Sequence, residues 1–211
     1  MRTKNNSKII RLVELAMLVA LVVVLQLLGS VIKIGPLPMS FVLVPIVIGA
    51  CLLGARSGAF LGGVFGVITM IMGIAGIDTF SYLLFTANPV WFIVICLLKA
   101  IMAGFVSGLV YKGLGKAFGE RFVYLKTVLS AVTAPIVNTG IFVVGMLLFF
   151  FETMEGLPAM FPDAFGQYEN AVSLVFIGLA GLNFVGEFLV NLVLSPAMVR
   201  IIDVVNKKIK I

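Results

Sequence analysis

Polar and charged side chains lie inside stretches of this sequence that are otherwise apolar, and their types could bind a polar molecule. Lys99 lies ten residues after Pro89 in an apolar block, too deep for its ammonium to reach either end easily. Asn183, Glu187 and Asn191 follow one another at intervals of four, which places them on one face of a helix. A charge near the centre of a membrane helix costs roughly 2.5–3.5 kcal/mol, so each such residue needs a physical reason.

Lys99 and Glu187 have opposite charges, and this allows two interpretations. They could form a charge pair that neutralises itself and fixes helix packing. They could instead line a polar cavity that holds a small solute with charged and hydrogen-bonding groups, which is the interpretation favoured here. Asn138 and Thr139, close to Pro135 in a later apolar block, would then add a third wall.

Tyr82 and Trp91 lie near the ends of apolar blocks, where Tyr and Trp are enriched in membrane proteins. Anchoring at the membrane interface explains them at least as well as stacking on a bound ring, and both are kept as candidate ligand contacts. Gln26, in the first apolar block, is better explained by a hydrogen bond between helices than by ligand binding.

The sequence carries no pattern typical of an enzyme. It has no histidine, no nucleophile with a neighbouring base, no paired acidic motif of an intramembrane protease and no phosphate-binding glycine loop. We therefore expect no catalytic residues, no metal site and no cofactor bound by this chain. Uptake of a solute would have to draw its energy from an ion gradient or from a partner protein.

The composition places these residues in a membrane. Of the 211 residues, 62% are hydrophobic and 11% are charged, against roughly 25% charged in a soluble domain. About 20 apolar residues in a helix cross the hydrocarbon core. The sequence predicts an all-α integral membrane protein of the cell membrane, multi-pass, with residues 1–211 forming one transmembrane domain of six helices. The predicted helices are residues 9–28, 40–54, 58–75, 89–111, 128–151 and 171–205.

The net charge of +6 could indicate nucleic acid binding, but the basic residues lie at the ends of the apolar blocks. Assigning alternate connections to opposite sides leaves Lys33 as the one basic residue on the second side. The positive-inside rule makes the first side cytoplasmic, so both termini are predicted to be cytoplasmic and no nucleic acid partner is expected. The basic residues on the first side are Arg2, Lys4, Lys8, Arg11, Arg56, Lys112, Lys116, Arg121, Lys126, Arg200, Lys207, Lys208 and Lys210.

Two series of small residues recur every fourth position, and this spacing allows two helix backbones to approach closely. They are predicted to be packing seams. The series are Gly58, Gly62 and Gly66, and Ala100, Gly104 and Gly108. Between the seams, residues 76–88 are predicted to be an ordered loop or re-entrant element, and residues 152–170 an acidic external connection.

The chain resembles the substrate-binding S components of energy-coupling factor (ECF) vitamin transporters over nearly its whole length. The resemblance rests on a basic N-terminus, the segment from Arg11 to Ala20, a short second helix containing Pro45, and the tight inner turn from Gly54 to Gly58. Six helices with both ends inside complete it.

The resemblance implies a binding protein without its own ATPase, which captures a vitamin from outside at high affinity. Its implied partners are a membrane coupling subunit and two cytoplasmic ATPases that use ATP. Ala16 and Ala20 match the small residues that pack on the coupling subunit in this family. The implied pocket contains Lys99, Asn138, Asn183 and Glu187, closed by lids at residues 33–39 and 80–88.

A buried Lys99 suits a ligand with a carboxylate, so pantothenate is the preferred vitamin, with folate, biotin or another acid as alternatives. Riboflavin-type members commonly have an acid at the entry to the second helix, and residues 38–45 have none. Two other classes of protein stay open: a self-sufficient proton-coupled secondary transporter or channel, in which Lys99 and Glu187 exchange protons, and a structural membrane subunit without a ligand.

Overall fold

Five helices of the described chain are long and apolar enough to cross a membrane. They are Lys8–Gly29, Ala55–Ile74, Pro89–Phe118, Val123–Phe149 and Ala171–Val205. The 20 residues of Ala55–Ile74 extend about 30 Å, which matches the hydrocarbon core of a bilayer. The chain is therefore a multi-pass membrane protein, as its composition predicts.

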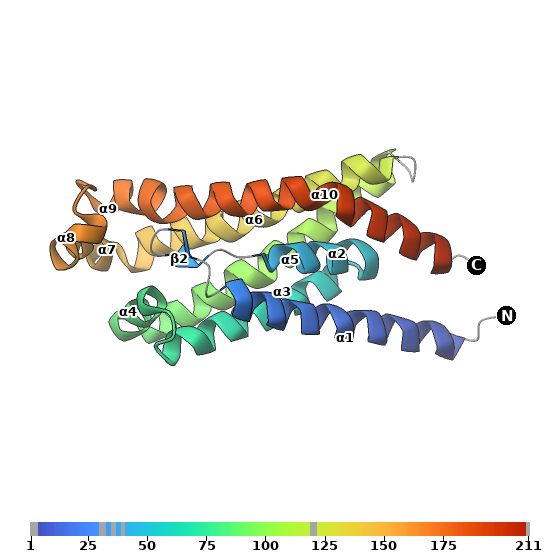
Figure 1. The fold of residues 1–211 in the computed structure, drawn as a ribbon, viewed down its shortest axis with the longest axis horizontal. Helices are drawn as coiled ribbons and strands as arrows, with labels where there is room; N and C mark the ends of the chain where they lie inside the picture. Colours follow the sequence, from blue (N-terminus) through green and yellow to red (C-terminus); the bar gives the residue numbers. More distant parts are fainter. Residues whose placement is uncertain (1–3, 30–32, 35–36, 39–40, 119–121, 210–211) are drawn as a thin grey trace.

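The computed structural model describes residues 4–29, 33–34, 37–38, 41–118 and 122–209, and these are almost entirely helical. The two short strands pair antiparallel, with Lys33 opposite Pro38. The elements in chain order are α1 (Lys4–Gly29), β1 (Lys33–Ile34), β2 (Leu37–Pro38), α2 (Leu43–Leu53), α3 (Ala55–Ile74), α4 (Thr79–Ala87), α5 (Pro89–Phe118), α6 (Val123–Phe149), α7 (Phe151–Met160), α8 (Pro162–Phe165), α9 (Ala171–Ser173), the π-helix η2 (Leu174–Gly181) and α10 (Leu182–Ile209) (Figure 1).

The short helix α2 is enclosed by its neighbours. Its 11 residues extend only about 16 Å, too little to cross the hydrocarbon core. It contacts α1, α3, α5, α6 and α10, and Leu43 and Ile46 are completely buried. A helix that is apolar all round is stable in such surroundings. Gly54 ends it with φ 97°, a conformation that suits glycine alone, so α3 begins at once at Ala55.

Helices α3 and α5 pack antiparallel along the two series of small residues. A Cβ atom added at Gly62 would overlap the carbonyl oxygen of Ala100, because the backbones lie too close for any side chain between them. The predicted packing seam is confirmed. Its facing pairs are Gly58 with Gly104, Gly62 with Ala100, and Gly66 with Cys96.

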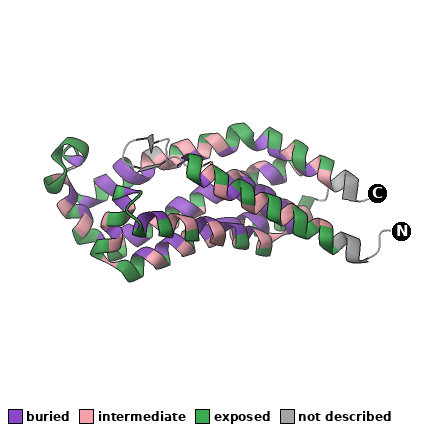
Figure 2. Ribbon diagram, turned by 60° about the horizontal axis from the view of Figure 1, so that its bottom comes forward, coloured by how far each residue is buried: buried purple, intermediate pink, exposed green. Residues whose placement is uncertain are grey.

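The two ends of the molecule differ in what they contain. The start of α1, the end of α10 and the region where α5 gives way to α6 lie at one end, and α4, α7 and α8 lie at the other (Figure 1). At the second end, Phe150, Met154 and Leu157 belong to a buried apolar core. Between the ends, many residues of the long helices are exposed (Figure 2). Many of these exposed residues are large and apolar, as lipid contact requires.

Several helices extend past the apolar blocks that predicted them. Helix α1 begins at Lys4, α5 continues to Phe118, and α6 begins at Val123, each beyond the range expected from hydropathy. Lysine is a good helix former, and its long stem lets the ammonium reach water from a helix end. The helix therefore continues where the apolar run stops.

The two segments expected to connect helices also contain helices. Residues 76–88 include α4, whose first turn is capped by Asp78, and residues 152–170 include α7 and α8. The last predicted helix, at residues 171–205, begins as α9 and then η2 before α10 starts. Because the sequence of η2 is apolar at nearly every position, hydropathy cannot distinguish its wider π-turn from an α-turn.

Candidate functional site

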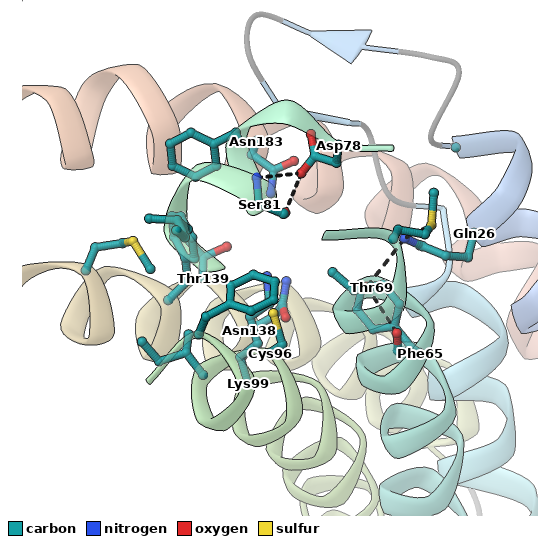
Figure 3. Close-up of a pocket in the computed structure, with 18 of the residues that line it drawn as sticks. Gln26, Phe65, Thr69, Asp78, Ser81, Cys96, Lys99, Asn138, Thr139 and Asn183 are labelled. Atoms are coloured by element: carbon teal, nitrogen blue, oxygen red, sulfur yellow. Dashed lines mark hydrogen bonds between the residues drawn. The ribbon is translucent and has the colours of Figure 1, made fainter. Parts of the chain in front are cut away.

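A cavity of about 90 Å³ lies in the half of the bundle that contains α4. Side chains from α1, α3, α4, α5, α6, η2 and α10 line it, together with the segment before α4. The structure brings together Lys99, Asn138, Asn183 and Glu187 in its wall, although they come from three separate helices. Figure 3 shows the first three of these residues. Thr139, the other polar residue expected beside Asn138, also lines it.

Most of the remaining wall is apolar. Phe80 and Phe92 are almost fully buried, and Phe92 also meets Phe85 edge to face with the ring centroids 6.0 Å apart. Ile95 and Met146 complete this side. A concave apolar surface with a few convergent polar groups is the usual form of a small-molecule site.

Glu187 is held by three asparagines. Asn138 Nδ2 donates to its Oε2 at 3.2 Å, and Asn183 Nδ2 donates to its Oε1 at 3.3 Å. Asn191 Nδ2 donates to the backbone carbonyl of Glu187 at 2.8 Å. Only 1% of Glu187 is exposed, and a buried carboxylate is stable only with such donors. Each of its two oxygens already has a partner.

Lys99 has a different environment. Its ammonium lies 5.1 Å from the ring centroid of Phe142, which gives a cation–π contact. No carboxylate of the described residues lies within 4.0 Å of it, so Lys99 and Glu187 share the cavity wall without forming a direct ion pair. With no carboxylate partner among the described residues, the ammonium can donate to another partner.

Three buried acceptors in the cavity wall have no donor among the described residues. They are Asp78 Oδ1, Asn138 Oδ1 and Thr139 Oγ1. Buried polar atoms are rarely left without a partner, because each costs about 1–3 kcal/mol in that state. Their gathering around one cavity indicates that hydrogen-bond donors belong inside it.

Asp78 and Ser81 are cavity residues that sequence reasoning missed. Asp78 is the N-cap of α4: its Oδ2 accepts hydrogen bonds from the backbone N–H of Ser81, at 3.1 Å, and from the Ser81 hydroxyl. An aspartate three residues before a serine is an N-cap signal, and it could have predicted α4. It would not have indicated a ligand contact.

Gln26 makes the interhelical hydrogen bond that the sequence predicts. Its Nε2 donates to Thr69 Oγ1 at 3.4 Å, which joins α1 to α3. Thr69 in turn donates to the backbone carbonyl of Phe65 at 3.0 Å. Gln26 and Thr69 also lie in the cavity wall, where they form the side opposite Thr139 (Figure 3).

The other predicted contacts lie away from the cavity. Trp91 stacks on Phe149 with the ring centroids 3.5 Å apart, and Tyr82 is 46% exposed; neither is part of the described cavity wall. Ala16 and Ala20 are exposed on α1. Of the predicted lids, the one at residues 80–88 is largely α4, and the one at residues 33–39 lies outside the described residues except for its two short strands.

No metal centre is visible in the part of the chain that the structure describes: it holds no group of three or more His, Cys, Asp or Glu side chains that could bind an ion. The arrangement around the cavity is suited to holding a molecule by one cation, several acceptors and an apolar wall.

Comparison with known proteins gives three findings. The family model described as the substrate-specific component of ECF transporters matches residues 10–199. The pantothenic acid transporter PanT of Lactococcus lactis subsp. cremoris (strain MG1363) is 30% identical over 162 residues, covering 72% of this chain and 79% of that protein. A solved structure of ThiT from Listeria monocytogenes covers 92% of this chain and 95% of its own with a TM-score of 0.65. At 19% identity, this last likeness shows a shared fold.

Proposed function

Because this chain belongs to the substrate-specific components of ECF transporters, we propose that it binds pantothenate in the cavity beside Lys99 and hands it to an ATP-driven coupling module. The observation that carries the choice of ligand is the contrast between Glu187 and Lys99 in the cavity wall. Both oxygens of Glu187 are occupied by asparagine amides, whereas the ammonium of Lys99 has no carboxylate partner among the described residues. A half-buried cation in the cavity wall, with no carboxylate partner among the described residues, suits a ligand with one carboxylate.

The rest of pantothenate also fits the groups around the cavity. The molecule carries a carboxylate at one end, two hydroxyls at the other, an amide between them and two methyl groups on a quaternary carbon. The unpartnered acceptors Asn138 Oδ1 and Thr139 Oγ1 suit its hydroxyl and amide donors. The apolar wall formed by Phe80, Phe92 and Ile95 suits the methyl groups. The relationship to PanT supports the same ligand.

Isothermal titration of the purified chain with pantothenate tests this proposal. We expect tight one-to-one binding and a rise in melting temperature, since a ligand that binds only the folded state stabilises it. β-Alanine carries only the acid end and pantoate lacks the amide-linked acid arm, so each should bind much more weakly. Full affinity for folate or biotin, with none for pantothenate, would refute the choice of ligand.

Six membrane-embedded helices with both termini in the cytoplasm complete the proposal. The sixth is α2, which is short but enclosed by the other helices. Arg11 near the start of α1, Lys112 and Lys116 in the last turns of α5, and Arg200 in the second half of α10 support a cytoplasmic location for that end. Labelling single cysteines placed at residue 116 and residue 163 with a membrane-impermeant reagent in whole cells tests it: we expect residue 163 to react and residue 116 to stay protected.

The coupling module is proposed to consist of one membrane subunit and two cytoplasmic ATPases, docking on α1 through Ala16 and Ala20. Both alanines are exposed, and their small side chains allow another helix to come close. Liposomes test this division of labour. The chain alone should bind pantothenate without moving it, even with an imposed proton gradient, and uptake should require the module and ATP. Gradient-driven uptake by the chain alone would show a self-sufficient transporter instead.

A further inference from the structure

We propose that Asp78 determines specificity by accepting a hydrogen bond from a hydroxyl of the ligand, and so fixes the ligand with its hydroxyl end toward α4 and its acid toward Lys99. This inference rests on the proposed function, since it assigns the orientation of the ligand in that same cavity. Asp78 lies in the short segment between α3 and α4 and is not one of the polar residues buried in a long helix.

The two oxygens of Asp78 have different roles. Oδ2 accepts from the backbone N–H and the hydroxyl of Ser81, which completes the N-cap of α4. Oδ1 is buried without a donor among the described residues, and the whole side chain is only 9% exposed. Capping α4 requires one oxygen, so it leaves the burial of the second oxygen without an explanation, in a residue that lines the cavity.

The chemistry of a carboxylate limits what can lie against Oδ1. An ionised carboxylate only accepts hydrogen bonds, so the facing ligand atom must be a donor such as a hydroxyl. The carboxylate of the ligand is excluded from this position, because two anions would face each other without an intervening proton. Lys99 has the opposite requirement: its ammonium only donates, and it attracts an anion.

The two groups lie on opposite sides of the cavity. Asp78 and Ser81 lie on one side, beside Asn183, and Lys99 lies on the other, beside Asn138 (Figure 3). A ligand with an acid at one end and hydroxyls at the other satisfies both sides in one orientation only. A flexible acid without hydroxyls, of similar length, would leave Asp78 Oδ1 buried without a partner. Selection against such acids follows from that cost.

The test compares two ligands in two proteins. Isothermal titration measures pantothenate and an analogue in which the terminal hydroxyl is replaced by fluorine, which cannot donate, against the wild-type chain and Asp78→Asn. The asparagine retains an oxygen that can cap α4 through the Ser81 N–H. In the wild type we expect fluorine to weaken binding about 10- to 100-fold. In Asp78→Asn we expect the binding of pantothenate itself to weaken, and the affinities of the two ligands to differ by less than about threefold. A second analogue, with fluorine in place of the other hydroxyl, identifies which of the two hydroxyls donates to Asp78.

The matched control is Asp163→Asn, which removes an exposed acid from α8 at the same end of the molecule. It should leave both affinities unchanged. Equal weakening of both ligands by Asp78→Asn would mean that Asp78 only caps α4, and would overturn the inference. If the variant does not fold, titrations of the wild-type chain decide the question. Undiminished affinity for both fluorinated analogues would overturn the inference. A wild type that does not bind pantothenate at all refutes the proposed function instead.

Discussion

Asn138 of α6 donates its side-chain amide to Glu187 of α10, Nδ2 to Oε2 at 3.2 Å, and so joins two membrane helices beside the cavity. The same asparagine leaves its own Oδ1 without a donor in the described chain. One side chain therefore stabilises the bundle with its nitrogen and keeps its oxygen for the cavity. Substitutions can distinguish the residues that stabilise the fold around the cavity from those that contact the ligand.

Replacing Glu187 with alanine should destabilise the protein. The change removes the acceptor for the amides of Asn138, which is buried, and Asn183, which is partly buried, and leaves both donors without that partner. We expect the free energy of unfolding to fall by about 1–3 kcal/mol. SDS titration in mixed micelles measures this. Glu155→Ala, an exposed position on α7, is the control and should change little. Equal stability of the two variants would contradict the structural role of Glu187.

Replacing Lys99 with methionine should weaken pantothenate binding without unfolding the protein. Methionine keeps the length and the apolar contact with Phe142 but removes the cation. A hydrogen bond to a charged group contributes about 1.5–3 kcal/mol, so affinity should fall by about 10- to 150-fold. Titration calorimetry checks this against Lys116→Met, an exposed lysine in the last turn of the same helix. Unchanged affinity in a folded Lys99 variant would exclude the role given to this residue.

Two neighbouring glycines of α3 should respond differently to alanine. A Cβ at Gly62 would overlap the carbonyl oxygen of Ala100 on α5, whereas a Cβ at Gly63 would meet Ile101 Cγ1 at an ordinary 3.7 Å. Overpacking costs about 1–3 kcal/mol, so Gly62→Ala should lower the unfolding free energy by that amount. Gly63→Ala should be neutral or slightly stabilising, because alanine favours helix. Equal melting temperatures would argue against the close α3–α5 contact.

Tryptophan at Ala16 and Ala20 should abolish uptake and leave ligand binding intact. Both positions are exposed on α1, so the larger side chains fit in lipid but keep a partner helix at a distance. The control pair is Val144→Trp with Leu148→Trp, two exposed positions four residues apart on α6. Uptake of labelled pantothenate in cells that express the complete transporter provides the measurement. Uptake that survives the α1 change, or that is lost equally in the control, would remove α1 as the docking helix.

The polar residues deep in the bundle could be predicted from the sequence. Lys99, Asn138, Asn183 and Glu187 lie in apolar helices, where each polar group is costly and therefore conspicuous. The spacing of four between Asn183 and Glu187 also predicts their hydrogen bond, because such residues lie on one helix face. The seam of α3 and α5 could be predicted for a similar reason, since small residues every fourth position have few other uses in a membrane.

Asp78 and Trp91 show where this reasoning stops. In the sequence, Asp78 follows the end of an apolar block. A carboxylate is unremarkable there, near the membrane surface, and its burial becomes evident only in the fold. The direction of Trp91 depends on the rotation of α5 about its axis, which hydropathy does not determine when a helix is apolar on every side. The π-turns of η2 likewise change the rotation of α10 by an amount that hydropathy does not predict.

Helix α1 is continuous from Lys4 to Gly29, and of residues 8–29 only Val22, Gln26 and Gly29 are buried. Ala20, on its outer surface, and Gln26, in the cavity wall, are separated by about 9 Å along the axis. One continuous helix therefore carries both a surface that another helix can approach and a residue of the cavity wall. A partner helix packed at Ala20 would therefore lie within two turns of the hydrogen bond from Gln26 to Thr69 that joins α1 to α3.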